Sequence, residues 1–379
     1  MKISPKSRTG DLIFDLHLPA REANSGQELM VMRKRTLWVS AFVALGLMTV
    51  SAGALWWSSV DIDGQHVADP ATRPEQLDFM QNAVNEKRGR ILAVVTSTGR
   101  APNTDINAGL ELTELARAYY VFKANGFEVD IASPQGGRPP INIDEELFEA
   151  DYAFLNDKIA QAQIANTLKV SDVDPRGYEA VYFVGGKGAM FDFPGNLPVQ
   201  GLVAEIYGRG GVVGAVCHGP AALIGARTKS GEPLFRGKRL TAFTDEEELF
   251  IIGNAREVFP FLLEERLRST DVQYLEGPKY LDHTIIDGKL VTGQNPWSTW
   301  SVAEGMVRAL GYTPVRREPT GEEKAIRILA AYRGKGLDAA RLAADKMPGF
   351  DKRTLLLHSV IEIMDGNVAD AFRIQRLVH

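Results

Sequence analysis

The stretch GGVVGAVCHGP, residues 210–220, decides the fold and contains the only cysteine of the 379-residue chain. Its apolar part, residues 212–216, is short and bounded by glycines, which is typical of a buried parallel strand. Cys217 and His218 follow directly, and an alanine- and leucine-rich segment comes next. A strand that turns sharply into a helix at a nucleophile is the geometry of a nucleophile elbow. The stretch therefore predicts an α/β fold with a thiol at a strand-to-helix turn.

The residues around Cys217 favour a reactive thiol. Ala215 and Gly219, two residues before and after it, leave room for a tight turn. The free N–H groups and dipole at the start of the next helix would favour a thiolate, so we expect labelling below the ordinary thiol pKa of about 8.5. The alternative is that a lone buried cysteine is an inert small hydrophobic residue.

Composition excludes several classes of function. The chain is 45% hydrophobic and 24% charged, which is ordinary for a globular protein, and its net charge is −5. No basic block with interleaved aromatic residues is present, so nucleic acid is not expected as a partner. A single cysteine and six scattered histidines provide neither a disulfide nor a zinc-ligand pattern. We predict no metal and no cofactor.

The N-terminal segment predicts export. Residues 38–57 are uncharged and long enough to span a bilayer as a helix, and the basic residues 33–35 precede them. The positive-inside rule then places residues 1–36 in the cytoplasm, residues 37–58 in the membrane, and the catalytic domain outside, in the periplasm. The alternative is a cleaved signal peptide over residues 30–54, because Ala52-Gly53-Ala54 fits a cleavage site.

After a polar linker, residues 59–88, the pattern alternates between strand and helix, and this predicts a doubly wound, mostly parallel sheet over residues 89–314. A C-terminal extension, residues 315–379, has helical spacing only. The expected strands are residues 91–96, 127–132, 180–184, 212–216, 239–244 and 284–292, and the expected helices are 110–125, 197–208, 245–253, 258–268 and 298–310, with a looser helical insertion at 143–169.

Two carboxylates are candidates to act with the thiol. His218 could take the thiol proton, and it then needs an acceptor to orient it. The acidic run 245–248 follows an expected strand and reaches the same sheet edge, although acidic residues also favour helix N-termini for dipole reasons. Glu114 lies on the same helical face as Leu110, which directs it inward, where a protonated carboxyl could donate to a thiolate. The alternative is that Glu114 is solvated.

The glycines of Gly185-Gly186-Lys187-Gly188 follow another expected strand. Backbone N–H groups there could face a developing oxyanion. A nucleotide-phosphate loop is the alternative, but the chain has neither the GxGxxG nor the Walker spacing here.

Together these motifs carry a resemblance over about residues 90–312. The segment resembles the ThiJ/PfpI superfamily, whose fold is the flavodoxin-like fold of class I glutamine amidotransferases, and within it the branch of heat-shock chaperones and glyoxalase III. The motifs that match are GFEVD (126–130), SPQGG (133–137), GG (185–186) through MFDFP (190–194), AVCHGP (215–220), FTDEEE (243–248) and DGKLVTGQNP (287–296).

The resemblance implies roles for individual residues. Cys217 corresponds to the nucleophile, His218 to the histidine after it, and Glu248 to the acid that orients that histidine. Glu114 corresponds to the glutamate that hydrogen-bonds the thiol. The N–H groups of Gly186 and His218 correspond to the oxyanion-binding pair.

The same resemblance implies an activity. Members of this branch convert methylglyoxal to lactate without glutathione, through a hemithioacetal on the cysteine. Lys187 departs from the branch, which commonly has a histidine within Gly-Gly-His-Gly, and this departure favours an anionic substrate. Family members are often dimers, which makes a homodimer a candidate assembly, although the sequence does not determine the oligomeric state. The alternative functions are a holding chaperone or protein deglycase and a peptidase or amidohydrolase.

Overall fold

The structure is a computed structural model, and it describes residues 65–378. The core is a seven-stranded sheet with the strand order β10-β11-β7-β6-β1-β3-β5. Its strands are β1 (Arg90–Val94), β3 (Glu128–Ser133), β5 (Leu168–Lys169), β6 (Ala180–Phe183), β7 (Val212–Val216), β10 (Thr284–Asp287) and β11 (Leu290–Gly293). All neighbouring pairs are parallel except β10 and β11. The prediction of an α/β fold with a mostly parallel sheet is confirmed.

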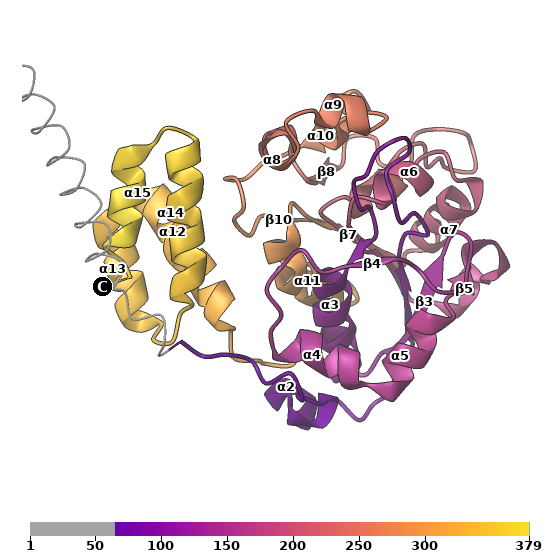
Figure 1. Ribbon diagram of the computed structural model, residues 1–379. Coiled ribbons are helices and arrows are strands. Elements are labelled where there is room, and N and C mark those ends of the chain that lie inside the picture. The colour runs from indigo at the N-terminus through magenta and orange to yellow at the C-terminus, as the bar shows by residue number, and fades with distance from the viewer. Residues whose placement is uncertain (1–64, 379) are drawn as a thin grey trace, which may run out of the picture. The chain divides into compact units, whose positions relative to one another are not determined.

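Both faces of this sheet are buried, which explains why its strands read as continuous apolar runs. In β1, Ile91 and Ala93 pack into one hydrophobic cluster, whereas Leu92 and Val94 pack into a second. Helices α3 (Leu112–Ala124) and α11 (Thr299–Ala309) contact each other, and α11 packs on β7 and β11. Helix α7 (Leu197–Gly208) also contacts β7 (Figure 1).

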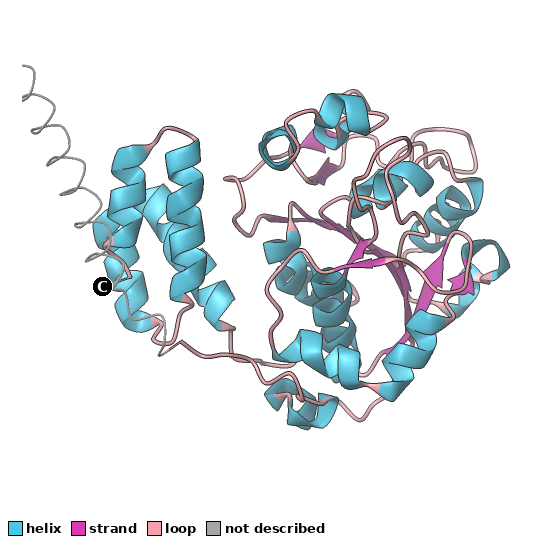
Figure 2. Ribbon diagram, viewed as in Figure 1, coloured by secondary structure: helices cyan, strands magenta, loops and turns pink. Residues whose placement is uncertain are grey.

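The remaining elements complete the arrangement around the sheet (Figure 2). Short helices precede and follow the strands: η1 (Pro74–Gln76), α2 (Asp78–Gln81), α4 (Glu149–Asn156), α5 (Lys158–Ala165), η2 (Val170–Asp172), η3 (Pro175–Gly177), α6 (Ala189–Asp192), η4 (Gly219–Leu223), α8 (Asp245–Ile251), α9 (Ala255–Val258), α10 (Leu263–Arg268) and η5 (Pro296–Ser298). Two further sheets have two strands each: β2 (Leu110–Glu111) with β4 (Ile141–Asn142), and β8 (Arg239–Leu240) with β9 (Gln273–Tyr274). Four helices end the described chain: α12 (Gly321–Lys335), α13 (Leu337–Lys346), α14 (Lys352–Met364) and α15 (Val368–Gln375).

Two expected strands differ in the structure. The segment 239–244 contributes only two residues, which pair with β9 outside the main sheet. The segment 284–292 is a hairpin rather than one strand, because Gly288 adopts φ +64° in the turn between β10 and β11. A glycine at the first position of a two-residue turn is what a hairpin of this kind requires.

The predicted membrane localisation is corrected. Among residues 65–378 no helix is long and apolar enough to cross a bilayer. The longest helix of that range, α12, has 15 residues, whereas a transmembrane helix needs about 20. The segment that carried the prediction of a membrane span, residues 38–57, and the alternative signal peptide at residues 30–54 lie outside the described residues.

Candidate active site

The backbone at Cys217 forms the expected sharp turn. Cys217 has φ +57°, a left-handed conformation that a residue with a side chain rarely adopts and that typically costs about 1 kcal/mol or more. Its N–H donates to the Gly293 carbonyl at 3.0 Å, and its own carbonyl accepts from Phe243 N at 2.9 Å. A Cβ on Gly219 would lie 2.2 Å from the Phe183 carbonyl oxygen, so only glycine fits there. The neighbouring strands therefore hold the thiol-bearing residue in a strained turn.

The segment after the elbow differs from the expectation. It is the five-residue 3-10 helix η4 rather than an α-helix. Without an aligned α-helix, the dipole that was expected to favour the thiolate is missing. Cys217 itself is 4% exposed, and burial, followed by the nearby Glu114 carboxyl, raises the pKa of its thiol well above the ordinary value. The buried site therefore favours labelling above, rather than below, the ordinary thiol pKa of about 8.5.

His218 connects the thiol to a carboxylate. Its Nδ1 lies 3.2 Å from Cys217 Sγ, and its Nε2 lies 2.6 Å from Glu248 Oε2. The ring lies between the rings of Phe243 and Phe259, with centroids 4.7 and 6.1 Å away. With the Nε2 proton donated to the carboxylate, the Nδ1 lone pair faces the thiol, which is the tautomer that a base needs. The geometry suits proton transfer from Sγ to Nδ1.

Glu248 reaches the imidazole from the first turn of α8. Thr244 caps this helix: its Oγ1 accepts from Glu247 N, and its own N–H donates to Glu247 Oε2, both at 3.1 Å. The capping box sets the start of the helix and therefore the direction of the next side chain. Glu248 is 3% exposed, so its bond to His218 is shielded from water.

Glu114 lies on the other side of the thiol. It is completely buried in the first turn of α3, its Oε2 accepts from Gly185 N at 2.6 Å, and its carboxyl hydrogen-bonds the Cys217 thiol. Burial, and then the charge of Glu111, raises the pKa of Glu114 well above the ordinary value. Both members of the Glu114–Cys217 pair are therefore neutral at rest, and the carboxyl has a proton to donate to a thiolate.

The two glycines before Lys187 fit tightly around the thiol. A Cβ on Gly185 would lie 2.5 Å from Glu114 Oε2 and 2.8 Å from Cys217 Cβ. Gly186 has φ +92°, and its N–H hydrogen-bonds Cys217, which favours the thiolate. The site thus contains one backbone donor at the position expected of an oxyanion-binding group.

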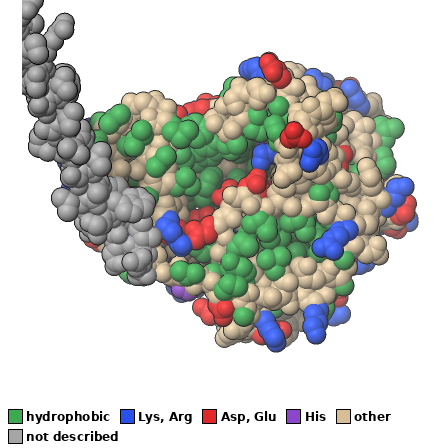
Figure 3. Space-filling view, in the orientation of Figure 1, with side chains coloured by type: hydrophobic (Ala, Val, Ile, Leu, Met, Phe, Trp, Pro, Cys, Tyr) green, Lys and Arg blue, Asp and Glu red, His purple; other side chains and the backbone are tan. Residues whose placement is uncertain are grey.

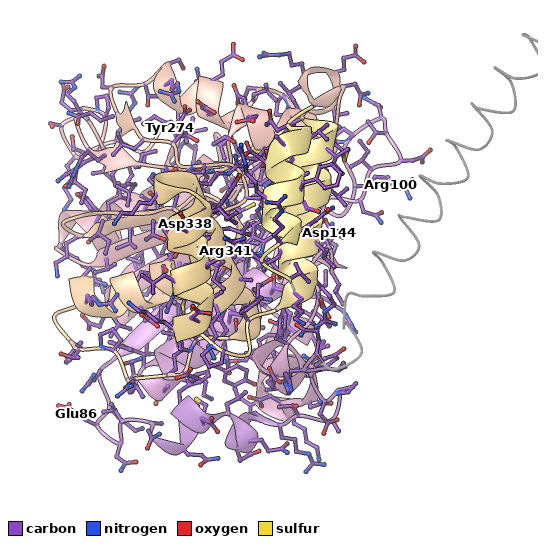
Figure 4. The ribbon with its side chains drawn as sticks, turned by 90° about the vertical axis from the view of Figure 1, so that its left-hand side faces the viewer. Glu86, Arg100, Asp144, Tyr274, Asp338 and Arg341 are labelled. Atoms are coloured by element: carbon purple, nitrogen blue, oxygen red, sulfur yellow. The ribbon has the colours of Figure 1, made fainter. Side chains whose placement is uncertain are left out.

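The side chain of Lys187, in the same loop, forms an ion pair with a carboxylate outside the thiol site. Its Nζ donates to Asp144 Oδ2 at 2.6 Å, and 18% of its side chain is exposed. Asp144, labelled in Figure 4, lies in the loop before α4. The cation at this position is therefore already paired, and an anionic substrate would have to compete with Asp144 for it.

The comparisons with known proteins agree with this geometry. Residues 106–309, more than half of the chain, match the DJ-1/PfpI family. The chain belongs to this family. "Glyoxalase 3" of Candida albicans is 30% identical over 236 residues, which cover 58% of the chain and 98% of the relative. "Glutathione-independent glyoxalase HSP31" of Saccharomyces cerevisiae is 34% identical over 239 residues, with the same coverage.

Solved structures of DJ-1/PfpI proteins and their relatives also match. The Rapid Encystment Protein of Francisella tularensis has a TM-score of 0.56 and 33% identity, covering 59% of the chain and 99% of that structure. Glyoxalase III of Candida albicans has a TM-score of 0.52 and 29% identity, covering 58% and 97%. The family match ends at residue 309, so helices α12–α15 lie beyond it.

Two further carboxylates of this DJ-1/PfpI chain have places in the site that the sequence reasoning did not assign. Glu247, completely buried, accepts from Tyr280 N, Gln294 Nε2 and Asn295 Nδ2 at 2.7, 3.0 and 2.9 Å. Glu111 is 4% exposed, and burial, followed by the charge of Asp144, raises its pKa to about 7. The amide pair Gln294-Asn295 after a buried strand was the available signal for Glu247, because buried amides need acceptors.

Proposed function

We propose that this chain is a glutathione-independent glyoxalase that converts methylglyoxal or a related 2-oxoaldehyde to a 2-hydroxy acid through a hemithioacetal on Cys217. The observation that carries the proposal is the contact set at the thiol, with His218 Nδ1 at 3.2 Å and the neutral Glu114 carboxyl on the other side. Relatives named as glutathione-independent glyoxalases, at 30–34% identity, support the same activity.

The first step requires a thiolate in a site where the thiol is neutral at rest. His218 takes the proton from Sγ as the sulfur attacks the aldehyde carbon, so the imidazolium forms between the thiolate and Glu248. The carbonyl oxygen becomes an oxyanion that the Gly186 N–H can stabilise, with the N–H of His218 as its second donor. Protonation of this oxygen yields the hemithioacetal.

The second step moves the C1 proton to C2 and the hydroxyl proton from the oxygen on C1 to the oxygen on C2, and it leaves the redox state of the adduct unchanged. A base, His218 or Glu114, removes the proton from C1, and the electron pair of that bond forms the enediolate. Protonation at C2 then yields a thioester of the 2-hydroxy acid with Cys217. Water adds to the thioester carbonyl, the C–S bond breaks, and the thiol is regenerated together with the acid.

The direct test is the purified chain with methylglyoxal and without glutathione. Wild type should form lactate, and Cys217→Ala should lose this activity, because no other thiol exists in the chain. The matched control is Ser133→Ala, which removes a buried hydroxyl of similar size on β3, away from the thiol. A Cys217→Ala variant with wild-type turnover would overturn the proposal.

A holding chaperone is the second candidate, and one observation favours it. Large apolar side chains on α14 and α15 are exposed, including Leu357 at 49%, Met364 at 65% and Phe372 at 62%. Hydrophobic side chains also gather over the C-terminal helices in Figure 3. Exposed patches of this kind are typical of surfaces that bind other proteins. Suppression of aggregation that persists in Cys217→Ala and disappears in Met364→Asp/Phe372→Asp would support this function.

A further inference from the structure

The C-terminal helices are connected to the two helices that carry the candidate catalytic carboxylates. Glu114 lies on α3, which pairs directly with α12. Glu248 lies on α8, which Lys279, in the segment between β9 and β10, joins to Asp365 just after α14. The two sets of contacts use different residues and can be tested independently.

The first set is a buried ion-pair network at α3. Arg117, one turn after Glu114, is 1% exposed. Its Nη2 donates to Asp151 at 3.2 Å and its Nη1 to Glu322, at the start of α12, at 2.7 Å. The Glu322 side chain is 7% exposed, so little water can replace it. Removing one partner of a buried ion pair leaves a charge without compensation, and the helix that carries the charge must adjust.

The second set links α14 to the first turn of α8. Lys279, whose side chain is 7% exposed, donates to Asp365 at the end of α14 at 2.5 Å and lies 3.3 Å from Glu246. Tyr280, the next residue, donates through its N–H and its hydroxyl to Glu247. Glu248 is thus anchored through its two preceding residues.

Aromatic packing reinforces this second set. The Trp297 ring contacts the rings of Tyr280 and His358, with centroids 5.6 and 6.1 Å away. Ile361 of α14 belongs to the same hydrophobic cluster as Cys217. The packing of α14 is therefore continuous with the core beneath the thiol.

We propose that helices α12–α15 position the active site: Glu322 holds α3 through Arg117, and α14 holds α8 through Lys279, so that Glu114 and Glu248 meet Cys217 and His218 in working geometry. Glu322 and Lys279 are positioning residues. This inference rests on the proposed roles of Glu114 and Glu248. A displacement of about 1 Å at a catalytic group can cost about a hundredfold in rate, so modest shifts of either helix are measurable.

The first experiment compares Glu322→Gln with Glu362→Gln in the full chain. Glu362 is also a buried glutamate, but its arginine partner, Arg333, lies on α12, within the C-terminal helices. Both variants should lower stability. We expect only Glu322→Gln to lower kcat, about fivefold or more with KM within about twofold, because positioning acts on the reacting groups rather than on substrate affinity.

The second experiment uses Lys279→Met, with Lys279→Arg as the conservative rescue. Methionine keeps the length of the side chain but loses the charge that joins Asp365 to Glu246. We expect Lys279→Met to lower kcat about fivefold or more and Lys279→Arg to stay within about twofold of wild type.

A readout that needs no glyoxalase activity separates this inference from the proposed function. The pH profile of Cys217 alkylation by iodoacetamide should shift by about half a unit or more in Glu322→Gln and Lys279→Met, because both alter the surroundings of the thiol. Glu362→Gln and Lys279→Arg should keep the wild-type profile. The inference is wrong if Glu322→Gln has the same kcat and the same alkylation profile as Glu362→Gln, and if Lys279→Met likewise matches Lys279→Arg in both measurements. Should Glu322→Gln fail to fold, the Lys279 pair decides alone.

Discussion

At the scale of single residues, the site joins a local pair, Cys217 and His218, to a carboxylate from a helix further along the chain. Cys217 and His218 are neighbours in the chain, so their contact is a local consequence of the elbow. The choice among the acidic residues 245–248 is not local. It depends on which side chain the helix start directs toward His218, and the structure directs Glu248 there and Glu247 toward Gln294 and Asn295. The neutral thiol depends on burial by distant segments, which spacing does not reveal.

The roles proposed for the two carboxylates predict slower turnover when either is changed. Glu114→Gln removes the proton donor to the thiolate, and Glu248→Ala removes the acceptor that holds the His218 tautomer. Each should slow methylglyoxal consumption at least about tenfold, equivalent to about 1.4 kcal/mol in the barrier. Initial rates at saturating substrate are the measurement. Unchanged rates in both variants would contradict the assigned roles.

The buried Glu114–Cys217 pair predicts an unusual pH dependence of labelling. Burial and the Glu114 carboxylate both raise the pKa of the thiol, so wild-type alkylation by iodoacetamide should rise only above a pH of about 8.5. Glu114→Gln removes the carboxyl group, whose ionisation as the pH rises would oppose the thiolate, so the labelling midpoint should move to lower pH. Glu128→Gln, an exposed substitution at the start of β3, serves as the control and should leave the midpoint in place. A midpoint that is already well below 8.5 in wild type would refute the neutral pair.

At the scale of elements, local sequence patterns predict single strands and helices. Which strands pair with each other depends on the fold of the whole chain. Helix α7 spans residues 197–208 as expected, because its apolar spacing and the Asn196 cap are local signals. The short β8 pairs with β9 rather than joining the main sheet, because β11 occupies the place beside β7. Asp287-Gly288 was a local hairpin signal, and it accounts for the split of the expected strand at residues 284–292.

The α8 element depends on the buried Glu247 carboxylate, and this predicts a large loss of stability in Glu247→Ala. The substitution leaves the Tyr280 N–H and the Gln294 and Asn295 amides without their shared acceptor. We expect the free energy of unfolding to fall by about 3 kcal/mol, because buried unsatisfied donors are expensive. Glu257→Ala, at an exposed position on α9, should change it by less than about 0.5 kcal/mol. Urea unfolding measures both, and equal effects would show that Glu247 is not the anchor of α8.

At the scale of the whole molecule, helix α14 lies beyond the family match and contacts the family fold through a buried histidine that stays neutral. His358 on α14 is 2% exposed and contacts Trp297 near the end of β11. Burial, followed by the charges of Arg333 and Lys279, lowers the pKa of His358 from 6.5 to about 3. The unfolded chain binds a proton at this histidine below a pH of about 6.5, whereas the folded chain does not.

The sign of this linkage predicts acid sensitivity. The contribution of His358 to stability is complete above a pH of about 6.5 and is lost as the pH falls toward 3. Between pH 7.5 and pH 5 the loss should be about 2 kcal/mol, since each pKa unit corresponds to about 1.4 kcal/mol. His358→Leu keeps an apolar side chain in α14 without a titrating group, so this part of the loss should disappear. Leu355→Ala, also buried in α14, should lower stability by about 3 kcal/mol at both pH values. The measurement is urea unfolding of wild type, His358→Leu and Leu355→Ala at pH 7.5 and pH 5. If His358→Leu keeps the full wild-type pH dependence of stability, the imidazole is not kept neutral at this contact.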